Sequence, residues 1–192
     1  VPLPKNEPIL SYGPGSSEKK ELKAKLTELK NNQIEIPIII GGKEIKTGNL
    51  AECRCPHNHK HVLATYHKAG EKEVEMAVAA ALKAREIWAS MPWEARASIF
   101  LKAADLLATK HRAALNAATM LAQSKTVFQA EIDSACELID FWRFNPYYMQ
   151  QIYQQQPASS PGCWNYVEQR PLEGFVFAVT PFNFSSIAGN LP

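Results

Sequence analysis

Residues 175–184 read FVFAVTPFNF, and this stretch decides the fold class that the sequence predicts. Its first five residues, Phe175 to Val179, are continuously apolar, as in a strand buried on both faces of a parallel sheet. Residues 180–184 then form a polar turn at the end of that strand. Ligands of open α/β sheets bind at the carboxyl ends of strands, so the turn is the first candidate for a functional site.

One strand of this kind cannot form a parallel sheet by itself. Without neighbours it leaves unpaired backbone groups and an apolar edge, and both are costly in water. Residues 185–190 begin a further helix, and only Leu191 and Pro192 follow. We therefore expect the chain to be truncated, with the partner strands in the missing part.

The first third of the chain predicts an arm, a helix and several strands. Residues 1–15 are rich in proline and glycine and predict an extended arm, and a charged helix follows from a Ser17 cap to about Lys30. Residues 36–47 predict a β-hairpin around two glycines. Two further strands are expected over residues 51–55 and 62–66.

The middle of the chain predicts helices. The first has an apolar stripe and ends at Met91-Pro92. Its stripe consists of Val74, Val78, Ala81, Leu82 and Trp88. Further helices are expected over about 99–107, 115–121 and 126–153, followed by a break at 156–162 and a short strand over 166–169.

Composition excludes several classes of partner. Hydrophobic residues make up 46% and charged residues 21% of the 192 residues, an ordinary globular balance. The net charge of +2 is too weak to predict nucleic-acid binding. No apolar run approaches the roughly 20 residues that cross a membrane. Four cysteines in a chain of this size favour a reducing compartment, and the N-terminal residues leave open whether a targeting segment was removed.

Residues 53–61 contain two cysteines and three histidines, which raises the alternative of a metal site. Zinc sites usually separate paired cysteines by two to four residues. Only one residue separates Cys53 from Cys55, and in a strand this spacing places the two thiols on opposite faces. A strand, a turn over Pro56 to His59 and a second strand are the favoured interpretation, with no metal.

Three carboxylates, Asp133, Glu137 and Asp140, share one face of the long predicted helix. A solvated face is the favoured interpretation, and a role for Glu137 at the mouth of a site is the alternative. The remaining nucleophile candidates, Cys136 and Cys163, have no neighbouring base and are expected to be structural. Asn183 by itself is compatible with a simple turn residue or with a functional amide.

Several blocks of the sequence resemble the aldehyde dehydrogenases. Residues 170–184 are similar to the motif that ends the first strand of their NAD-binding domain. Residues 100–107 (FLKAADLL), 125–133 (KTVFQAEID) and 137–145 (ELIDFWRFN) resemble one family in particular, the eukaryotic Δ1-pyrroline-5-carboxylate dehydrogenases of proline catabolism, also called glutamate-semialdehyde dehydrogenases. This resemblance extends over nearly the whole chain, from about Asn6.

The resemblance implies a role for each matching residue. In that family a cysteine attacks the aldehyde, hydride passes to NAD, and a water activated by a glutamate cleaves the thioester. The Asn183 amide is the implied catalytic donor to the developing oxyanion, a contribution of about 3 kcal/mol. Thr180, Pro181 and Phe182 are implied to contact NAD. Phe184 is implied to line the aldehyde site, and Glu137 to face the substrate entrance.

The resemblance also implies an α/β fold, truncated: an arm, a β-hairpin, a helical layer and the first strand of the dinucleotide-binding sheet. The expected regions are 1–33 (arm and helix), 34–67 (strands of the oligomerisation region), 68–162 (helical part of the NAD-binding domain) and 163–192 (strand and start of its core). The family's nucleophile and general base lie beyond Pro192. Ser124 also departs from the family, since glycine is common at its position.

The implied parent enzyme oxidises L-glutamate γ-semialdehyde to L-glutamate with NAD, in the mitochondrial matrix and as a homo-oligomer, without nucleic-acid or membrane partners. This chain alone is expected to be inactive. Two alternatives remain open: an aldehyde dehydrogenase with another substrate, and a non-catalytic short isoform that binds full-length subunits through residues 36–47.

Overall fold

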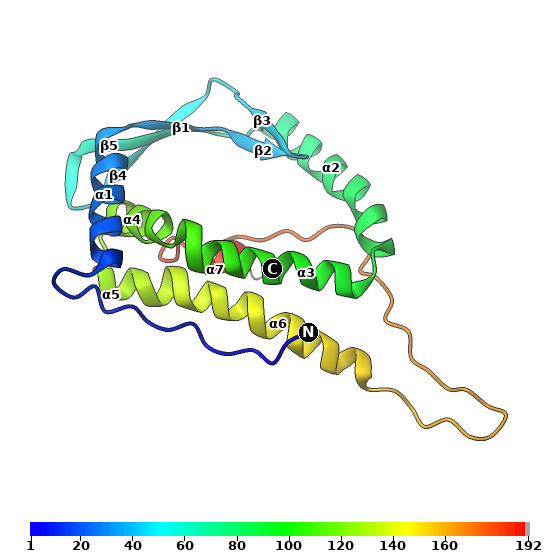
Figure 1. The fold of residues 1–192 in the computed structure, drawn as a ribbon. Coiled ribbons are helices and arrows are strands. Elements are labelled where there is room, and N and C mark those ends of the chain that lie inside the picture. Colours follow the sequence, from blue (N-terminus) through cyan, green and yellow to red (C-terminus); the bar gives the residue numbers. More distant parts are fainter. Residues whose placement is uncertain (191–192) are drawn as a thin grey trace.

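The computed structural model describes residues 1–190, which form a β-region, a layer of helices and a long C-terminal segment without regular structure (Figure 1). The β-region arches over the helices at one side of the molecule. The N-terminal arm runs along the opposite side of the layer, beside the helix α6 (Glu137–Gln154). The C-terminal segment projects from the end of that helix and then turns back.

The helix α1 (Ser17–Asn31) follows the arm. Its N-cap is Ser16, whose side chain accepts a hydrogen bond from the backbone N–H of Lys19 at 3.4 Å. The predicted cap, Ser17, is therefore wrong by one residue and is the first residue of the helix. Both serines can supply the hydroxyl oxygen that a cap needs. The backbone conformation distinguishes them, because Ser16 is extended and Ser17 is helical.

The β-region contains two small sheets. In one sheet β5 (Asn58–His67) lies between β1 (Ile34–Ile36), which is parallel to it, and β4 (Leu50–Cys55), which is antiparallel. The other sheet is the antiparallel hairpin of β2 (Ile38–Ile40) and β3 (Lys43–Ile45). The strands expected over 51–55 and 62–66 are thus confirmed.

The predicted hairpin is confirmed from Ile38 onward. Its turn residues Gly41 and Gly42 have φ angles of 57° and 75°, a conformation that glycine adopts without steric cost. Ile36 belongs instead to β1, where it pairs with Tyr66. Pro37 separates the two strands because it has no N–H to donate to a neighbour.

The helical layer consists of three helical runs. The first is α2 (Glu71–Ser90), which ends before Met91-Pro92 as predicted. The second joins α3 (Trp93–Leu106), the π-helical η1 (Leu107–His111) and α4 (Arg112–Gln123). The third joins α5 (Val127–Ala130), the π-helical η2 (Glu131–Cys136) and α6 (Glu137–Gln154). A short helix, α7 (Ile187–Asn190), follows near the C-terminal end.

The long helix expected over 126–153 is confirmed as the third run. The two helices expected over 99–107 and 115–121 are parts of one continuous run, because η1 joins them.

The main core of the helical layer lies between α3 and α6 and is built from small and branched residues. Its fully or nearly fully buried members are Ala104, Leu107, Ala135, Leu138 and Ile139. The apolar stripe of α2 is different, since Val74, Leu82 and Trp88 are all at least 40% exposed.

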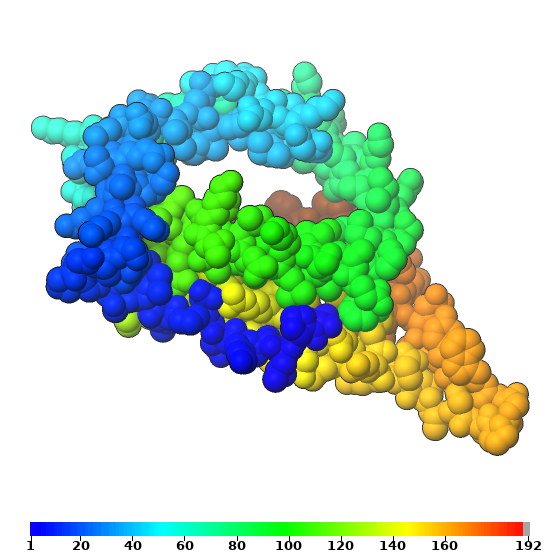
Figure 2. All heavy atoms as spheres, in the orientation of Figure 1, coloured from blue at the N-terminus to red at the C-terminus, as the bar shows by residue number. Residues whose placement is uncertain are grey.

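The strand predicted over Phe175–Val179 is absent from this structure, and so is the one over 166–169. Phe177 and Val179 are each 81% exposed. A strand requires a neighbour for its backbone hydrogen bonds, and none of the strands in residues 1–190 lies beside this segment. Figure 2 shows how residues 155–170 project from the rest of the molecule.

Candidate functional site

The turn at residues 180–184 is attached to the helical layer through its backbone. Lys125, between α4 and α5, donates from Nζ to the carbonyl oxygen of Asn183 at 2.5 Å. Gln123, the last residue of α4, donates from Nε2 to the carbonyl oxygen of Phe182 at 3.0 Å. Two adjacent carbonyl groups of the turn are therefore fixed by the same helix junction.

The Lys125 ammonium group makes two further contacts. It lies 2.5 Å from Oδ2 of Asp133, and both side chains of this pair are less than 20% exposed. It also lies 4.8 Å from the centre of the Phe184 ring, within the range of a cation–π interaction. One cation thus connects η2 to two consecutive residues of the turn.

A cluster of hydroxyl groups fixes the residues that follow the turn. Thr119 Oγ1 lies 2.8 Å from Ser134 Oγ and 2.5 Å from Ser185 Oγ. Ser186 donates to the backbone carbonyl of Ser134 at 3.0 Å. Ser186 and Ile187 are buried, so the chain re-enters the core directly after the exposed turn.

The predicted catalytic and cofactor residues are all on the exposed side of this turn. Thr180, Pro181, Phe182 and Asn183 are exposed, and Phe182 is 95% exposed. Among the described residues, the side-chain amide of Asn183 has no hydrogen-bond partner. The turn therefore has two bonded backbone carbonyl groups and an exposed side-chain amide at Asn183.

Phe184 and Glu137 both lie near the pair of Lys125 and Asp133. Phe184 packs on Lys125 and is 36% exposed. Burial raises the pKa of the Glu137 carboxyl group above its usual value, and the nearby charge of Asp133 raises it further, while Lys125 opposes the shift. Glu137 and Phe184 are thus both within the electrostatic environment of Lys125 and Asp133.

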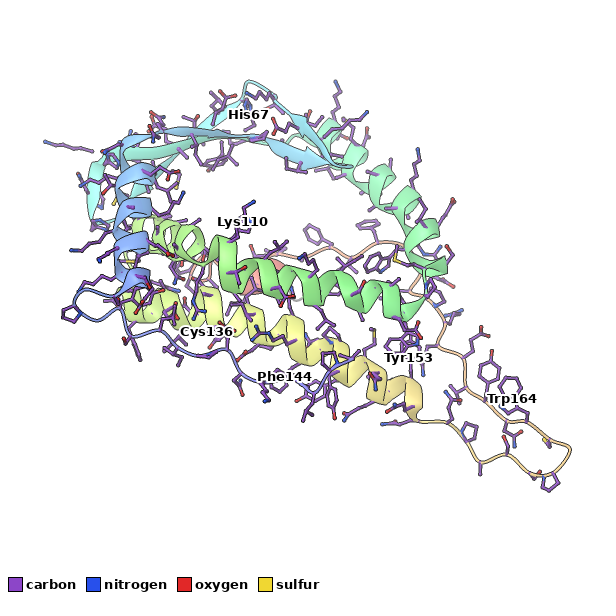
Figure 3. All side chains as sticks on the ribbon, in the orientation of Figure 1. His67, Lys110, Cys136, Phe144, Tyr153 and Trp164 are labelled. Carbon is purple, nitrogen blue, oxygen red and sulfur yellow. The ribbon has the colours of Figure 1, made fainter. Side chains whose placement is uncertain are left out.

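Glu137 also lines a groove on the outer face of α6, with a volume of about 410 Å³. Figure 3 shows Phe144, another residue of this groove, on that face of the helix. The groove combines two carboxylates with aromatic rings and two side-chain amides. Its lining residues are Asn6, Glu137, Asp140, Phe141, Phe144, Asn145 and Tyr148.

The prediction that the carboxylates of this helix form a solvated face is wrong for Asp133 and Asp140. Asp133 is paired with Lys125. Asp140 accepts hydrogen bonds at 2.7 Å from the Asn6 side chain and from the backbone N–H of Glu7. Helical spacing places these carboxylates on one face, but it contains no information on the lysine and the arm that cover them.

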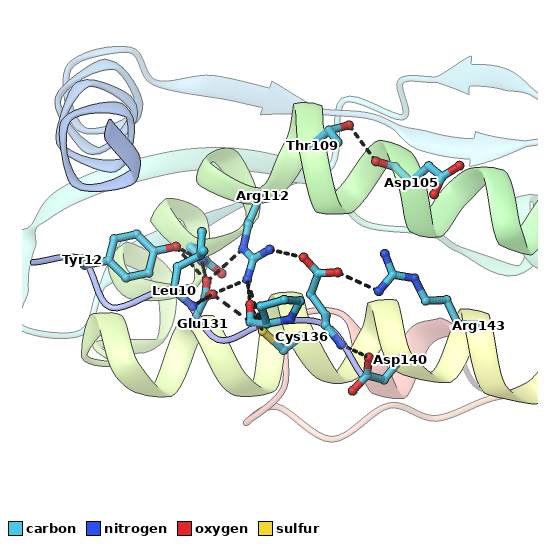
Figure 4. A network of polar contacts seen from close by, with 12 residues as sticks. Leu10, Tyr12, Asp105, Thr109, Arg112, Glu131, Cys136, Asp140 and Arg143 are labelled. Atoms are coloured by element: carbon cyan, nitrogen blue, oxygen red, sulfur yellow. Dashed lines mark hydrogen bonds and ion pairs between the residues drawn. The ribbon is translucent and has the colours of Figure 1, made fainter. Parts of the chain in front are cut away.

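The structure also contains a buried network that the sequence analysis missed (Figure 4). The Glu131 side chain is fully buried and is ion-paired with Arg112. It also accepts hydrogen bonds from Leu10 N–H, Tyr12 and Asn116 at 2.7–2.8 Å. One sequence signal was available: Glu131 lies four residues before Ala135, on the apolar face of the helix, where an unpaired carboxylate would be costly.

Glu7 extends this network along the arm. Its two carboxylate oxygens accept from Arg112 at 2.5 Å and from Arg143 at 2.6 Å. The arm is therefore connected to α4 and α6 by charged groups, directly beside the groove. Burial raises the pKa of the neighbouring Cys136 thiol to about 12, so this cysteine is not a nucleophile at neutral pH.

Residues 53–61 form a strand, a turn and a strand, as in the favoured interpretation, but the turn ends at His57 and β5 already begins at Asn58. Cys55 is buried, and its sulfur lies 3.1 Å from Nε2 of His57. Nδ1 of His57 lies 2.8 Å from the Ser124 hydroxyl oxygen. Across residues 1–190, no three His, Cys, Asp or Glu side chains are grouped so that they could hold a metal ion.

Among residues 1–190, no helix combines the length and the apolarity that spanning a membrane requires.

The sequence profile of the aldehyde dehydrogenase family matches residues 44–189. This chain belongs to the aldehyde dehydrogenase family. It is 52% identical over 194 residues to the Δ1-pyrroline-5-carboxylate dehydrogenase of Agaricus bisporus. It is 46% identical over 186 residues to the mitochondrial enzyme of that name from Homo sapiens. These alignments cover 100% and 97% of this chain.

A solved aldehyde dehydrogenase has the same fold. The Δ1-pyrroline-5-carboxylate dehydrogenase from Mycobacterium tuberculosis bound with NAD matches all of this chain with a TM-score of 0.96 and 50% identity. The predicted fold class and the predicted resemblance are confirmed. The chain spans only 36% of the length of the Agaricus and Mycobacterium proteins and corresponds to the N-terminal third of the aldehyde dehydrogenase fold.

Proposed function

We propose that this chain is the N-terminal part of an NAD-dependent dehydrogenase that oxidises L-glutamate γ-semialdehyde, the open form of Δ1-pyrroline-5-carboxylate, to L-glutamate. The names of the relatives and about 50% identity over the whole chain support this proposal. Several of those relatives are named mitochondrial, which supports the mitochondrial matrix as the location.

The observation that carries the proposal is the arrangement of Asn183. Its backbone carbonyl is fixed by Lys125, while its side-chain amide is exposed. A donor amide stabilises an oxyanion best when it is oriented before the charge develops, because no reorganisation is then needed during the reaction. Asn183 is the proposed donor to the aldehyde oxygen as this oxygen becomes negative.

Thr180, Pro181 and Phe182 are the proposed contacts of NAD. They fit this role because they form one exposed edge of a turn with a fixed backbone, and Phe182 offers an apolar ring that a partner would cover. When bound, NAD supplies the hydride acceptor. The contribution of these residues is to place the cofactor beside the amide of Asn183.

Phe184 and Glu137 are the proposed substrate contacts. The Phe184 ring packs against the Lys125 ammonium group, which fixes the ring near the turn. Glu137 lies at the groove on α6, and its raised pKa reflects partial burial beside two other carboxylates. We assign to Glu137 the role of a carboxylate at the substrate entrance.

The nucleophile and the general base of the proposed reaction belong to the part of the enzyme that follows this chain. Cys136 cannot replace the nucleophile because it is buried and has a raised pKa. The 192-residue chain alone is therefore expected to form no NADH from glutamate semialdehyde. Exposed isoleucines at the β-region, Ile34, Ile36 and Ile39, support a homo-oligomeric assembly of the complete enzyme.

The test is a complete enzyme in which residues 1–192 precede the remaining sequence of the Agaricus relative. NADH formation from Δ1-pyrroline-5-carboxylate and NAD is measured for this enzyme, for Asn183→Ala and for Asn31→Ala, a control at the exposed end of α1. We expect Asn183→Ala to lower kcat about 10²–10³-fold and Asn31→Ala to leave it unchanged. A folded, NAD-binding enzyme without this oxidation, or with greater activity on another aldehyde, would contradict the proposal.

A further inference from the structure

Lys125 contacts the turn at the peptide group of Asn183 itself. We infer that Lys125 is a positioning residue for the oxyanion reaction, because it fixes the backbone from which the Asn183 amide extends. The inference rests on the proposed function of Asn183. Lys125 is exposed too little, at 15% of its side chain, to be a ligand site of its own.

The Lys125 ammonium group contacts two residues of the turn, Asn183 and Phe184, and the carboxylate of Asp133 in η2. The group donates to the Asn183 carbonyl oxygen and to Asp133, each at 2.5 Å, and lies 4.8 Å from the centre of the Phe184 ring. Two oxygen acceptors and one aromatic ring thus hold the ammonium group. Movement of the Asn183 backbone would break one of these contacts.

The chain on both sides of Lys125 is fixed. Ser124 closes α4 in a left-handed conformation, with φ of 54°, and its hydroxyl group contacts His57. Thr126 is the N-cap of α5, with its side chain accepting from Gln129 N–H and its own N–H donating to the Gln129 side chain. Lys125 therefore extends from a junction with little freedom, and its ammonium group can act as a rigid support.

Asp133, which lies in η2, accepts a hydrogen bond from the Lys125 ammonium group. Its second oxygen accepts a hydrogen bond from the Ser134 hydroxyl group at 3.1 Å, and this serine belongs to the cluster that holds Ser185. Asn183 in the turn and Ser185 directly after it are thus tied to the same segment of η2. A displacement of about 1 Å at a catalytic group is enough to lower a rate about 10²-fold, so the support affects the reaction without contacting the substrate.

The first test is a double-mutant cycle in the complete enzyme described above. Lys125→Met removes the charge at similar length, and Lys125→Arg keeps it. Lys110→Met, at an exposed lysine of η1 (Figure 3), is the matched control. We expect Lys125→Met to lower kcat by about 10–100-fold, with KM for NAD changed less than about two-fold. Lys125→Arg should recover part of the loss, and Lys110→Met should have no effect.

The decisive comparison is made in the Asn183→Ala background. If Lys125 acts through Asn183, then Lys125→Met causes less than about a two-fold further loss once the amide is absent. A loss of the same size in both backgrounds would overturn the inference, because it would indicate a general structural role. Thermal unfolding of each variant identifies any that fails to fold.

A second measurement is independent of activity. Crystal structures of the complete enzyme described above and of its Lys125→Met and Lys110→Met variants give the order of the Asn183 backbone through its B-factors. We expect low B-factors in the unaltered enzyme and in Lys110→Met, and raised B-factors in Lys125→Met. Unchanged order in Lys125→Met would overturn the inference. Ordered behaviour that depends on Lys125, in an enzyme without dehydrogenase activity, would contradict only the proposed function.

Discussion

Glu131 is a carboxylate enclosed entirely by protein, and each of its oxygens has partners. Leu10 N–H and Arg112 contact one oxygen, and Tyr12, Asn116 and Arg112 contact the other. Burial alone would raise its pKa, but these donors outweigh the burial and hold the pKa below its usual value. The residue therefore remains charged and holds the arm on the helices.

Replacement of Glu131 by glutamine removes the fully buried carboxylate partner of Arg112 and leaves Glu7 as its remaining carboxylate partner among the described residues. Breaking one side of a buried ion pair typically costs about 3–5 kcal/mol, so we expect a loss of about 3 kcal/mol in the free energy of unfolding. Urea denaturation of the chain at neutral pH measures this loss. The matched variant Glu52→Gln, in the exposed pair with Arg54, should change stability by less than about 1 kcal/mol.

The loss of stability in Glu131→Gln should depend on pH. A carboxyl group with a lowered pKa in the folded state stabilises the fold above its unfolded pKa, near 4.5, and loses this contribution as the pH falls through the folded value. The difference between Glu131→Gln and the unaltered chain should therefore diminish below pH 4.5. A difference that stays constant down to acid unfolding would contradict this account.

The pKa of Glu137 is shifted in the opposite direction to that of Glu131. Because partial burial, Asp133 and Asp140 raise its pKa, the folded state favours the protonated form, and the charged form at neutral pH carries a penalty. Glu137→Gln should thus raise the unfolding midpoint at pH 7, and this gain should disappear in acid, where glutamate is protonated in both states. Thermal unfolding at both pH values checks it, and a loss of stability at pH 7 would refute it.

Among the helices, the junction between α4 and α5 determines where the site lies. The Thr126 side chain and Gln129 form a reciprocal cap at the start of α5. Thr126→Ala removes one side of this cap and should cost about 1 kcal/mol, whereas Thr126→Ser keeps the hydroxyl group and should cost less. Denaturation of the two variants provides the comparison, and equal losses would show that the hydroxyl group is not the cause.

The elements that local sequence determines were predicted correctly. The two glycines at positions 41 and 42 permit the positive φ angles of the hairpin turn, and Pro92 prevents the extension of α2. The strand predicted over residues 175–179 is wrong because a strand depends on neighbours that the local pattern does not contain. The π-helical segments η1 and η2 were also missed, since no residue type specifies an extra residue in a helical turn.

The sequence indicated part of the candidate site, and the roles of its residues stay predictions. The resemblance pointed to the turn around Asn183, and the structure places Phe184 and Glu137 in the surroundings of the same Lys125–Asp133 pair. The sequence did not indicate Lys125 or the Glu131–Arg112 pair. Lys125 bonds to Asn183, 58 residues away, and Glu131 bonds to Arg112 and Leu10, 19 and 121 residues away. At such separations side-chain contacts leave no local periodic signal.

Taken as a whole, the chain presents much apolar surface after α6. Single exposed apolar residues are ordinary, but here they follow one another along a segment that has no helix or strand before α7. The most exposed of them are Trp164, Leu172, Phe177, Val179 and Phe182, each at least 79% exposed. Nothing else among residues 1–190 covers them.

We expect the 192-residue chain to self-associate for this reason. Its mass in solution should rise with protein concentration, and it should bind a dye that reports exposed apolar surface. The double variant Phe177→Asp/Val179→Lys should reduce both effects, and Lys43→Ala/Glu44→Ala in β3 serves as a control on another exposed surface. Light scattering gives the mass, and a monomeric, dye-negative chain at high concentration would contradict this prediction.

The arm has a consequence for how this protein is made. Its anchors are distant in sequence: Leu10 bonds to a residue 121 positions later, and Glu7 to one 136 positions later. Translation proceeds at about 5–20 residues per second, so the arm waits on the order of ten seconds before its partners emerge from the ribosome. During that interval Glu7 and Tyr12 remain hydrated, and α4 exists without the carboxylate that neutralises Arg112. Binding of the arm to the helices is therefore a late step of synthesis, and chaperones have access to the uncovered helices until it occurs.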